Sequence, residues 1–339
     1  MKTKALVLGT LPLVLLAALT LPASAQYVTV GDPGNPNDST GYGAVATTYA
    51  IGTYEVTLNQ YAAFLNAKAV TDTFLLYNTN MGTNLNIAGI SRTGSSGSYV
   101  YGVIGTGTRP VTYVSFYDAM RYANWLNNGG GSGDTETGGY TLLGGTATPS
   151  NGLTVTRNGG AQVWVPSENE WYKAAYYQPL AAGGDSDGYW LYPTGSNAIP
   201  NSRNGSVSDA NSGNFYRDDS IANGFNGGYA VTNSMSFPSG NALTAVGAFT
   251  QADSYYGTFD QGGNVWEWND TIVGSSRGLR GGSCYYHEYN LRASNRSPNV
   301  PTFENNNVGF RVATVPEPTS AVILSCGALM LLTMRRRTL

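Results

Sequence analysis

Histidine, cysteine and lysine are scarce in this chain of 339 residues, and each shortage excludes a class of protein. His287 is the single histidine, so a metal site built from two or three histidines is excluded by count. Cys284 and Cys326 are the two cysteines, and Cys326 lies near the C-terminus, so residues 26–315 cannot form an intramolecular disulfide. The body of the chain must therefore be stabilised by a hydrophobic core.

Basic residues are also few between residues 26 and 315, where Lys68 and Lys173 are the only lysines. The whole chain has 18 basic and 21 acidic residues, and five basic residues and one acidic residue lie outside this range. That leaves 13 basic and 20 acidic residues, a net charge of −7. Phosphate binding depends on clustered Lys and Arg, so we expect no nucleic-acid partner.

Glycine and tyrosine, in contrast, are abundant, with 44 and 24 residues. Glycine-rich sequence predicts many turns and irregular loops. The aromatic content of 12% is too high for a disordered chain. We therefore expect a folded body, as one large domain or two closely joined lobes, with a modest amount of regular structure.

Residues 1–25 have the order of a secretory signal peptide. Lys2 and Lys4 precede an apolar run, and the small residues Ala23-Ser24-Ala25 follow it. We predict cleavage after Ala25. The alternative is an N-terminal membrane anchor, but the run is short beside the roughly 20 apolar residues that a spanning helix needs.

Residues 315–339 combine a proline pair, an apolar stretch and a basic end. Pro316-Glu317-Pro318 is followed by apolar residues 319–334 and then by Arg335, Arg336 and Arg337, which favour the cytoplasmic side of a membrane. This order resembles the PEP-CTERM sorting signal, which implies an exosortase-type processing enzyme as a partner and a membrane segment before processing. The alternative is an ordinary C-terminal anchor. We expect an exported protein at the cell surface, tethered or released.

Three helices are predicted by capping patterns, in which a hydroxyl residue is followed three positions later by a side chain that can reach back to it. The pairs are Thr57 with Gln60, Ser115 with Asp118, and Ser167 with Glu170. Short extended segments precede them at residues 49–56, 109–114 and 162–165. Glycine-rich loops at 127–139 and 183–214 are long enough to need an anchor, and a metal ion is a common one.

Six phrases occur in a fixed order along the body: TYEVTLNQYAAFLNA, RPVTYVSFYDAMRYANWLN, VWVPSENEWYKAAYY, GGNVWEW, LRGGS and NVGFRVA. Together they resemble the formylglycine-generating enzyme family, also called the sulfatase-modifying-factor domain, over residues 45–313, with residues 26–44 as a lead-in. The resemblance implies a compact, irregular α/β (α+β) fold, similar to C-type lectins, with few regular elements and bound calcium.

The resemblance implies a calcium site formed by the side chains of Asp260 and Glu267 and the carbonyls of Gly263 and Val265. Calcium binds about six to eight oxygen atoms of these kinds. The alternative is that Glu267 forms a salt bridge with an arginine. A looser match implies a second, weaker calcium site, because an asparagine stands where aspartate is common; its residues are Asn211, Ser212, Asn223 and Phe225.

Oxidase members of the family bind copper(I) through two cysteines shortly after the GGS motif. In this chain Ser283 is followed by Cys284, and the second cysteine is missing, so a bis-thiolate site cannot form. We therefore do not expect copper. Cys284 and Ser283 would be the catalytic residues if activity remained. Nonheme-iron members require several histidines, which the single His287 excludes.

Two classes of function remain open, together with a structural role in an extracellular matrix. The first is a noncatalytic binding domain for an extracellular polysaccharide or protein, because Tyr and Asn in loops favour adaptable contacts. Its surface would follow the GGS motif, with Ser283, Cys284 and Trp268 beside the ligand contacts Trp266, Tyr285, Tyr286, His287, Tyr289 and Asn290. The alternative is that these tyrosines fill the core. The second class is an active or divergent oxidoreductase of the family.

Overall fold

The computed structural model describes residues 26–316, apart from residues 85, 88 and 206–208. The predicted signal peptide and residues 317–339 of the predicted sorting tail lie outside the described residues. None of the helices in the described part has the length and apolar character that a membrane crossing needs. The helices are α1 (Leu58–Lys68), α2 (Asn80–Thr83), α3 (Phe116–Asn127) and α4 (Glu168–Tyr176), with 3-10 turns η1 (Leu180–Ala182) and η2 (Glu288–Leu291).

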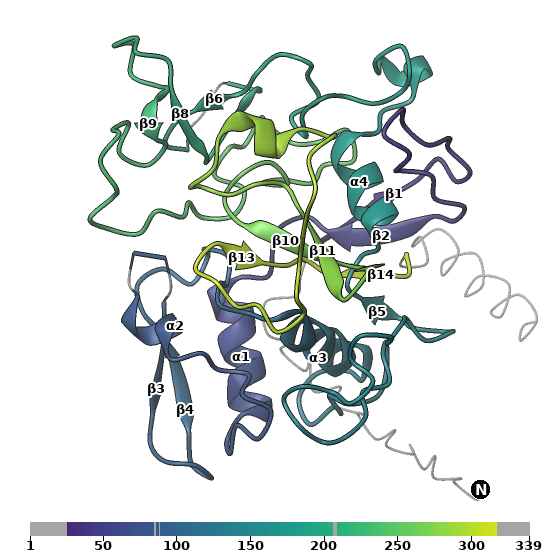
Figure 1. Ribbon diagram of the computed structural model, residues 1–339, viewed down its shortest axis with the longest axis vertical. Coiled ribbons are helices and arrows are strands. Elements are labelled where there is room, and N and C mark those ends of the chain that lie inside the picture. Colours follow the sequence, from purple (N-terminus) through teal and green to yellow (C-terminus); the bar gives the residue numbers. More distant parts are fainter. Residues whose placement is uncertain (1–25, 85, 88, 206–208, 317–339) are drawn as a thin grey trace, which may run out of the picture.

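Two four-stranded sheets form the centre of the fold, as Figure 1 shows. The first has the order β1-β2-β14-β5 and is antiparallel throughout. The second has the order β12-β11-β10-β13, with β10 and β13 parallel. Their strands are β1 (Tyr27–Val30), β2 (Tyr49–Gly52), β5 (Val163–Trp164), β10 (Trp266–Val273), β11 (Ser276–Arg280), β12 (Ser297–Asn299), β13 (Val308–Gly309) and β14 (Ala313–Thr314).

In the part of the chain that the structure describes, three further strand pairs lie outside these sheets. They are β3 (Ile90–Thr93) with β4 (Val100–Val103), β6 (Asn201–Ser202) with β7 (Ser212–Gly213), and β8 (Tyr216–Asp218) with β9 (Gly227–Tyr229). The fold is thus a mixed α/β fold with little regular structure. The predicted fold class is confirmed.

All three predicted helix starts are present as complete capping boxes. Thr57, Ser115 and Ser167 each accept a hydrogen bond from the backbone N–H three residues on, and the side chain at that position accepts from the capping residue in return. Each box satisfies two backbone donors that the first helical turn leaves free. Local sequence therefore fixes where α1, α3 and α4 begin.

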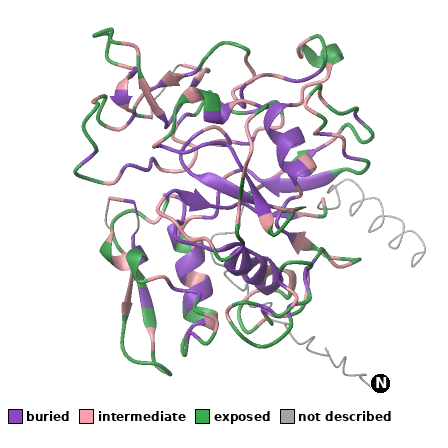
Figure 2. Ribbon diagram, in the orientation of Figure 1, coloured by how far each residue is buried: buried purple, intermediate pink, exposed green. Residues whose placement is uncertain are grey.

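The helices bury one another's aromatic faces in a common core. Tyr61 and Phe64 of α1 contact Tyr122 of α3, with ring centroids 6.1 and 5.4 Å apart, and Phe310 packs on Tyr122 at 5.4 Å. Figure 2 shows burial concentrated in α3, α4 and the central strands, with exposed residues in the peripheral loops. The core places β10 and β11 at the centre of the molecule.

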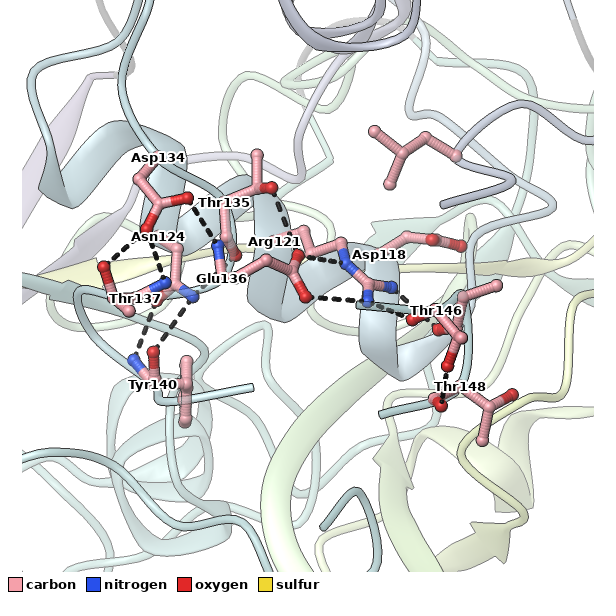
Figure 3. A network of polar contacts seen from close by, with 12 residues as sticks. Asp118, Arg121, Asn124, Asp134, Thr135, Glu136, Thr137, Tyr140, Thr146 and Thr148 are labelled. Carbon is pink, nitrogen blue, oxygen red and sulfur yellow. Dashed lines mark hydrogen bonds and ion pairs between the residues drawn. The ribbon is translucent and has the colours of Figure 1, made fainter. Parts of the chain in front are cut away.

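Side chains of α3 hold the long loop that follows it. The guanidinium of Arg121 donates to both carboxylate oxygens of Glu136, at 2.7 and 3.2 Å, and to the carbonyls of Thr146 and Ala147 (Figure 3). Asn124 donates to the carbonyls of Thr135 and Tyr140. These hydrogen bonds anchor the loop through buried protein groups.

Two segments differ from their predicted form. Residues 109–114 form a single bridge, between Pro110 and Thr57, and do not join a sheet as a strand. Tyr113 has a φ of 59°, which interrupts an extended conformation. The predicted lead-in, in contrast, contains a strand, because β1 pairs with β2 from Tyr27 opposite Gly52 to Val30 opposite Tyr49.

Candidate functional site

The GGNVWEW phrase forms a tight loop that leads into β10. Asp260, Gly263 and Asn264 have φ values of 61°, 103° and 54°, in the left-handed region that favours glycine. A Cβ atom on Gly263 would lie 2.4 Å from the carbonyl oxygen of Asn214, so this position requires glycine. Val265 is fully buried in an apolar cluster. The loop thus places the predicted calcium residues on one connected segment.

Glu267 lies on β10, opposite Arg280 of β11, and is fully buried. Its Oε2 atom accepts from Arg311 Nε at 2.6 Å and from Trp171 Nε1 at 2.9 Å. Its Oε1 atom accepts from Arg311 Nη2 at 2.7 Å. Both oxygens of Glu267 are therefore engaged by protein donors, in the arginine pair that the sequence left open as an alternative.

Asp260 is half-buried and its Oδ2 atom accepts from the backbone N–H of Gly247 at 2.6 Å. Burial raises the pKa of Asp260 to about 6, although the Gly247 hydrogen bond and the charge of Arg311 lower it. Asp260 and Ser212 line one small cavity of about 10 Å³, which has room for a single water molecule or ion. One residue of each predicted calcium set, Asp260 of the first and Ser212 of the second, therefore borders the same cavity.

The residues predicted to bind the first calcium ion differ in whether their oxygen atoms are free to bind a metal. Among the described residues, no group of three or more His, Cys, Asp or Glu side chains is arranged to hold a metal. Asp260 offers one carboxylate oxygen without a hydrogen-bond donor, whereas Glu267 is held by Arg311. Glu55, whose charge interacts with that of Asp260, is 1% exposed, and neither of its carboxylate oxygens has a hydrogen-bond partner among the described residues. Calcium itself stays a prediction.

The second predicted calcium set is spread over two strand pairs. Asn211 accepts from Thr194 Oγ1 at 2.6 Å and donates to the carbonyls of Ala198 and Ile199. Ser212, in β7, donates to the carbonyl of Asp209 at 2.9 Å. The other two members lie in the turn between β8 and β9, where the Asn223 side chain accepts from the backbone N–H of Phe225.

Cys284 and Ser283 lie inside the protein, at 1% and 0% exposure. The Cys284 thiol packs in an apolar cluster with Ile87, Leu243 and Val265, and burial raises its pKa above the ordinary value. A thiol in apolar surroundings stays protonated and unreactive. Ser283 accepts from Asn307 Nδ2 at 3.3 Å. The two residues contribute to packing in this conformation.

Aromatic side chains gather where the segment after the GGS motif meets the β8–β9 pair. Tyr216 contacts Tyr229 and His287, each at 4.9 Å between ring centroids, and Tyr216 N–H donates to the Tyr286 carbonyl. His287 stacks on Tyr289 with an interplanar angle of 11°. The set, which we name the aromatic surface, comprises Tyr216, Tyr229, Phe237, Tyr285, Tyr286, His287 and Tyr289.

The aromatic surface is partly open to solvent. Tyr286, Phe237 and Tyr289 are 41%, 47% and 50% exposed. Phe237 stacks on Tyr285 at 5.4 Å, and the ring of Trp266 contacts that of Tyr286 edge-on at 5.6 Å. The rings are thus joined from Phe237 through Tyr229 and Tyr216 to His287 and Tyr289, whereas the ring of Tyr286 packs on the buried Trp266.

The remaining residues predicted for this surface are buried. Trp266 and Trp268 are 5% and 0% exposed, and the Trp268 indole donates to the Val114 carbonyl at 3.0 Å. Asn290 is 7% exposed and donates to the His287 carbonyl. Sequence analysis did not predict Tyr216, Tyr229 and Phe237. The only signal for them was their aromatic residue type in a glycine-rich loop.

The chain is thus a mixed α/β domain of short elements, in which Glu267 is buried against Arg311 and aromatic rings are exposed in the segment after the GGS motif. It belongs to the family of sulfatase-modifying factor enzyme 1-like domains, whose model matches residues 34–315. A comparison with curated proteins gives no significant match.

Several solved structures are similar to this chain at low sequence identity. The structure of CarF is 19% identical, with a TM-score of 0.51, and the match covers 87% of this chain and 99% of CarF. Treponema denticola variable protein 1 is 18% identical, with a TM-score of 0.47 and coverage of 86% and 95%. PvdO from Pseudomonas aeruginosa is 18% identical, with a TM-score of 0.40 and coverage of 86% and 92%. At 19% identity, the similarity to CarF indicates the fold alone.

Proposed function

We propose that this chain is an exported, noncatalytic binding domain that contacts an extracellular polysaccharide or protein through the aromatic surface. The observation that carries the proposal is the exposure of Phe237 and Tyr289 on a connected set of rings, next to Tyr286, which is also exposed and whose carbonyl accepts from Tyr216 N–H. Large aromatic residues provide contact area at low cost in conformational entropy, and they dominate binding energy in many interfaces. Export rests on the two ends of the sequence.

The burial of the lone thiol supports a noncatalytic role. An oxidase of this family would need accessible thiolates, whereas Cys284 is enclosed and its pKa is raised by burial. The alternative of a divergent oxidoreductase has its own test. Tight copper(I) binding by the purified chain, lost in Cys284→Ala, would favour that alternative over the binding proposal.

Binding is tested with the extracellular matrix fraction of the source cells, before and after protease or periodate treatment. The variant Tyr286→Ala/Tyr289→Ala should bind at least about tenfold more weakly, because central aromatic residues carry most of the affinity of a surface. Tyr255→Ala is the matched control, since Tyr255 is 43% exposed and pairs with Tyr256. Equal binding by both variants would reject the aromatic surface as the site.

The two treatments distinguish the two ligand classes. Periodate cleaves sugars with neighbouring hydroxyl groups, so loss of binding after periodate identifies a polysaccharide. Loss after protease identifies a protein. If the wild-type chain does not bind the matrix fraction even before treatment, the proposal of matrix binding fails.

A further inference from the structure

A cavity of about 510 Å³ lies at one end of the first sheet, where β2 and β5 begin and β14 ends. Figure 1 shows this end well away from the β8–β9 pair, and no residue of the aromatic surface lines the cavity. Sites for small molecules typically occupy roughly 300–1,000 Å³. The lining residues that could contact a ligand are Thr48, Arg157, Gly159, Gly160, Trp164 and Glu170.

Arg157 is held in a defined orientation where it lines this cavity. Its guanidinium carbon lies 4.6 Å from the centroid of the Trp164 ring. Its Nη1 atom donates to both carboxylate oxygens of Glu170, at 2.9 and 3.2 Å. Glu170 is itself held at the start of α4, because its Oε2 atom also accepts from the backbone N–H of Ser167 and from Trp164 Nε1. The indole ring and the carboxylate therefore position the guanidinium.

One edge of the Arg157 guanidinium is left for a ligand. Among the described residues, Arg157 donates hydrogen bonds through Nη1 alone, so its Nε–H and Nη2–H groups have no protein acceptor. These groups form the side edge of the guanidinium, and their parallel N–H bonds match the two oxygens of a carboxylate. The Arg157 side chain is 34% exposed, so a ligand can reach it.

The protein binds its own carboxylates through this same edge of other arginines. Arg121 donates from Nε and Nη2 to the two oxygens of Glu136, at 2.7 and 3.2 Å. Arg311 donates from Nε and Nη2 to the two oxygens of Glu267, at 2.6 and 2.7 Å. Arg157 presents the same pair of donors beside a cavity, and no carboxylate among the described residues fills it.

Two glycines next to Arg157 add backbone donors to the cavity. The N–H groups of Gly159 and Gly160 have no acceptor among the described residues. A Cβ atom at either position would meet no atom within 4 Å, so the backbone is open to a ligand. Gly160 has a φ of 81°, which favours glycine. Open backbone N–H groups of this kind bind anions in many proteins.

The charge of the lining limits which anion fits. Arg157 and Glu170 are the only charged residues among those that line the cavity, and they form an ion pair. A neutral lining accommodates one negative charge better than the roughly two charges of a phosphate group. The Thr48 hydroxyl and the glycine backbone can also exchange hydrogen bonds with hydroxyl groups of a ligand.

We propose that this cavity binds one hexuronate unit, an acidic sugar, with its carboxylate on the Nε and Nη2 atoms of Arg157. The backbone N–H groups of Gly159 and Gly160 and the hydroxyl of Thr48 contact the remaining oxygen atoms. The site is independent of the aromatic surface. It gives the domain a second contact for a sugar chain, one that selects the carboxylate.

The test is an NMR titration of the full chain with glucuronate, because NMR detects weak ligands. The methyl ester of glucuronate keeps the sugar and lacks the charge, so it should bind at least about tenfold more weakly. Acetate keeps the carboxylate and lacks the hydroxyl groups, and inorganic phosphate carries more charge, so both should also bind more weakly. Equal or tighter binding of the ester or of phosphate would overturn the carboxylate assignment, and equal binding of acetate would overturn the sugar.

Arg157→Lys separates the side edge of the guanidinium from its charge. Lysine keeps a positive charge beside Glu170 but lacks the paired donors, so the affinity for glucuronate should fall at least about tenfold. Arg203→Lys is the matched control, because Arg203 also donates from Nη1 to an acid, Asp209, is 33% exposed, and lies 5.6 Å from the ring centroid of Phe225. Arg203 does not line the cavity, so this variant should bind as the wild type does.

Two further results would overturn the proposal. One is a wild-type chain that does not bind glucuronate, and the other is an Arg157→Lys variant with wild-type affinity. If Arg157→Lys fails to fold, the comparison of glucuronate with its methyl ester decides, because it needs only the wild-type chain. Tyr286→Ala/Tyr289→Ala should keep wild-type affinity for glucuronate, so failure of the aromatic surface as a binding site would leave this result unchanged.

Discussion

Glu267 and Arg311 form a bidentate ion pair in which both side chains are 0% exposed. The pair connects β10 to the segment between β13 and β14, and through the remaining Arg311 donors it also holds the carbonyls of Gly52 and Phe259. One guanidinium therefore ties together three stretches of chain that are distant in sequence. Its desolvation cost is offset only while every donor and acceptor keeps its partner.

Removing Arg311 should destabilise the fold severely. Arg311→Met leaves the Glu267 carboxylate buried without its cation, which typically costs about 3–5 kcal/mol. The measurement is the free energy of unfolding in urea. Arg203→Met is the control, because the Arg203–Asp209 pair is one third and one quarter exposed and such pairs contribute at most about 1 kcal/mol. Similar losses in both variants would contradict the special role of the buried pair.

Arg121 should control the order of the loop after α3. Arg121→Met removes the donors to Glu136, Thr146 and Ala147, so amide hydrogen exchange in residues 134–148 should accelerate and stability should fall by about 2–4 kcal/mol. Amide hydrogen exchange in α4 should accelerate much less than exchange in this loop, once the loss of global stability is allowed for. Unchanged protection of the loop would show that its backbone hydrogen bonds suffice.

The starts of α1, α3 and α4 could be predicted because a capping box is contained within four consecutive residues. The Glu267–Arg311 pair could not be assigned, because its members are 44 residues apart and the sequence offers several arginines. Sequence left the arginine pair and the calcium ligand as alternatives for Glu267. Only the three-dimensional arrangement brings Arg311 into contact with Glu267.

Only part of the candidate binding surface could be predicted, and the reason is related. Irregular loops have no periodicity, so sequence cannot tell which of Cys284, Tyr285 and Tyr286 point inward. The structure buries Cys284 and exposes Tyr286. The contribution of Tyr216 and Tyr229 depends on the β8–β9 pair, whose strands contain only three residues each and lack an alternating apolar pattern.

Asp118 should make stability depend on pH. Burial raises the pKa of Asp118 to about 7, and the charge of Glu304 adds to this, against the hydrogen bonds from Ser115. The folded state thus holds a proton that the unfolded state releases near pH 4. The stabilisation is complete below about pH 4 and is lost as pH rises through 7.

The test is the free energy of unfolding between pH 4 and pH 8. Asp118→Asn should reduce its decline over this range by about 1–3 kcal/mol relative to wild type. Asp253→Asn, which alters an exposed carboxylate, should leave the decline unchanged. A wild-type pH profile in Asp118→Asn would mean that Asp118 is ionised in the folded protein at neutral pH.

Cys284 should be unreactive until the domain unfolds. The thiol is 1% exposed among apolar side chains, and burial raises its pKa, so the thiolate that attacks a disulfide reagent is almost absent near pH 8. In a Cys326→Ser background, labelling by an aromatic disulfide should be slow in buffer and stoichiometric in concentrated guanidinium chloride. Because labelling then follows local opening, its rate should also rise in Arg311→Met. Fast labelling of the native chain would instead indicate an accessible, activated thiol and would reopen the oxidoreductase alternative.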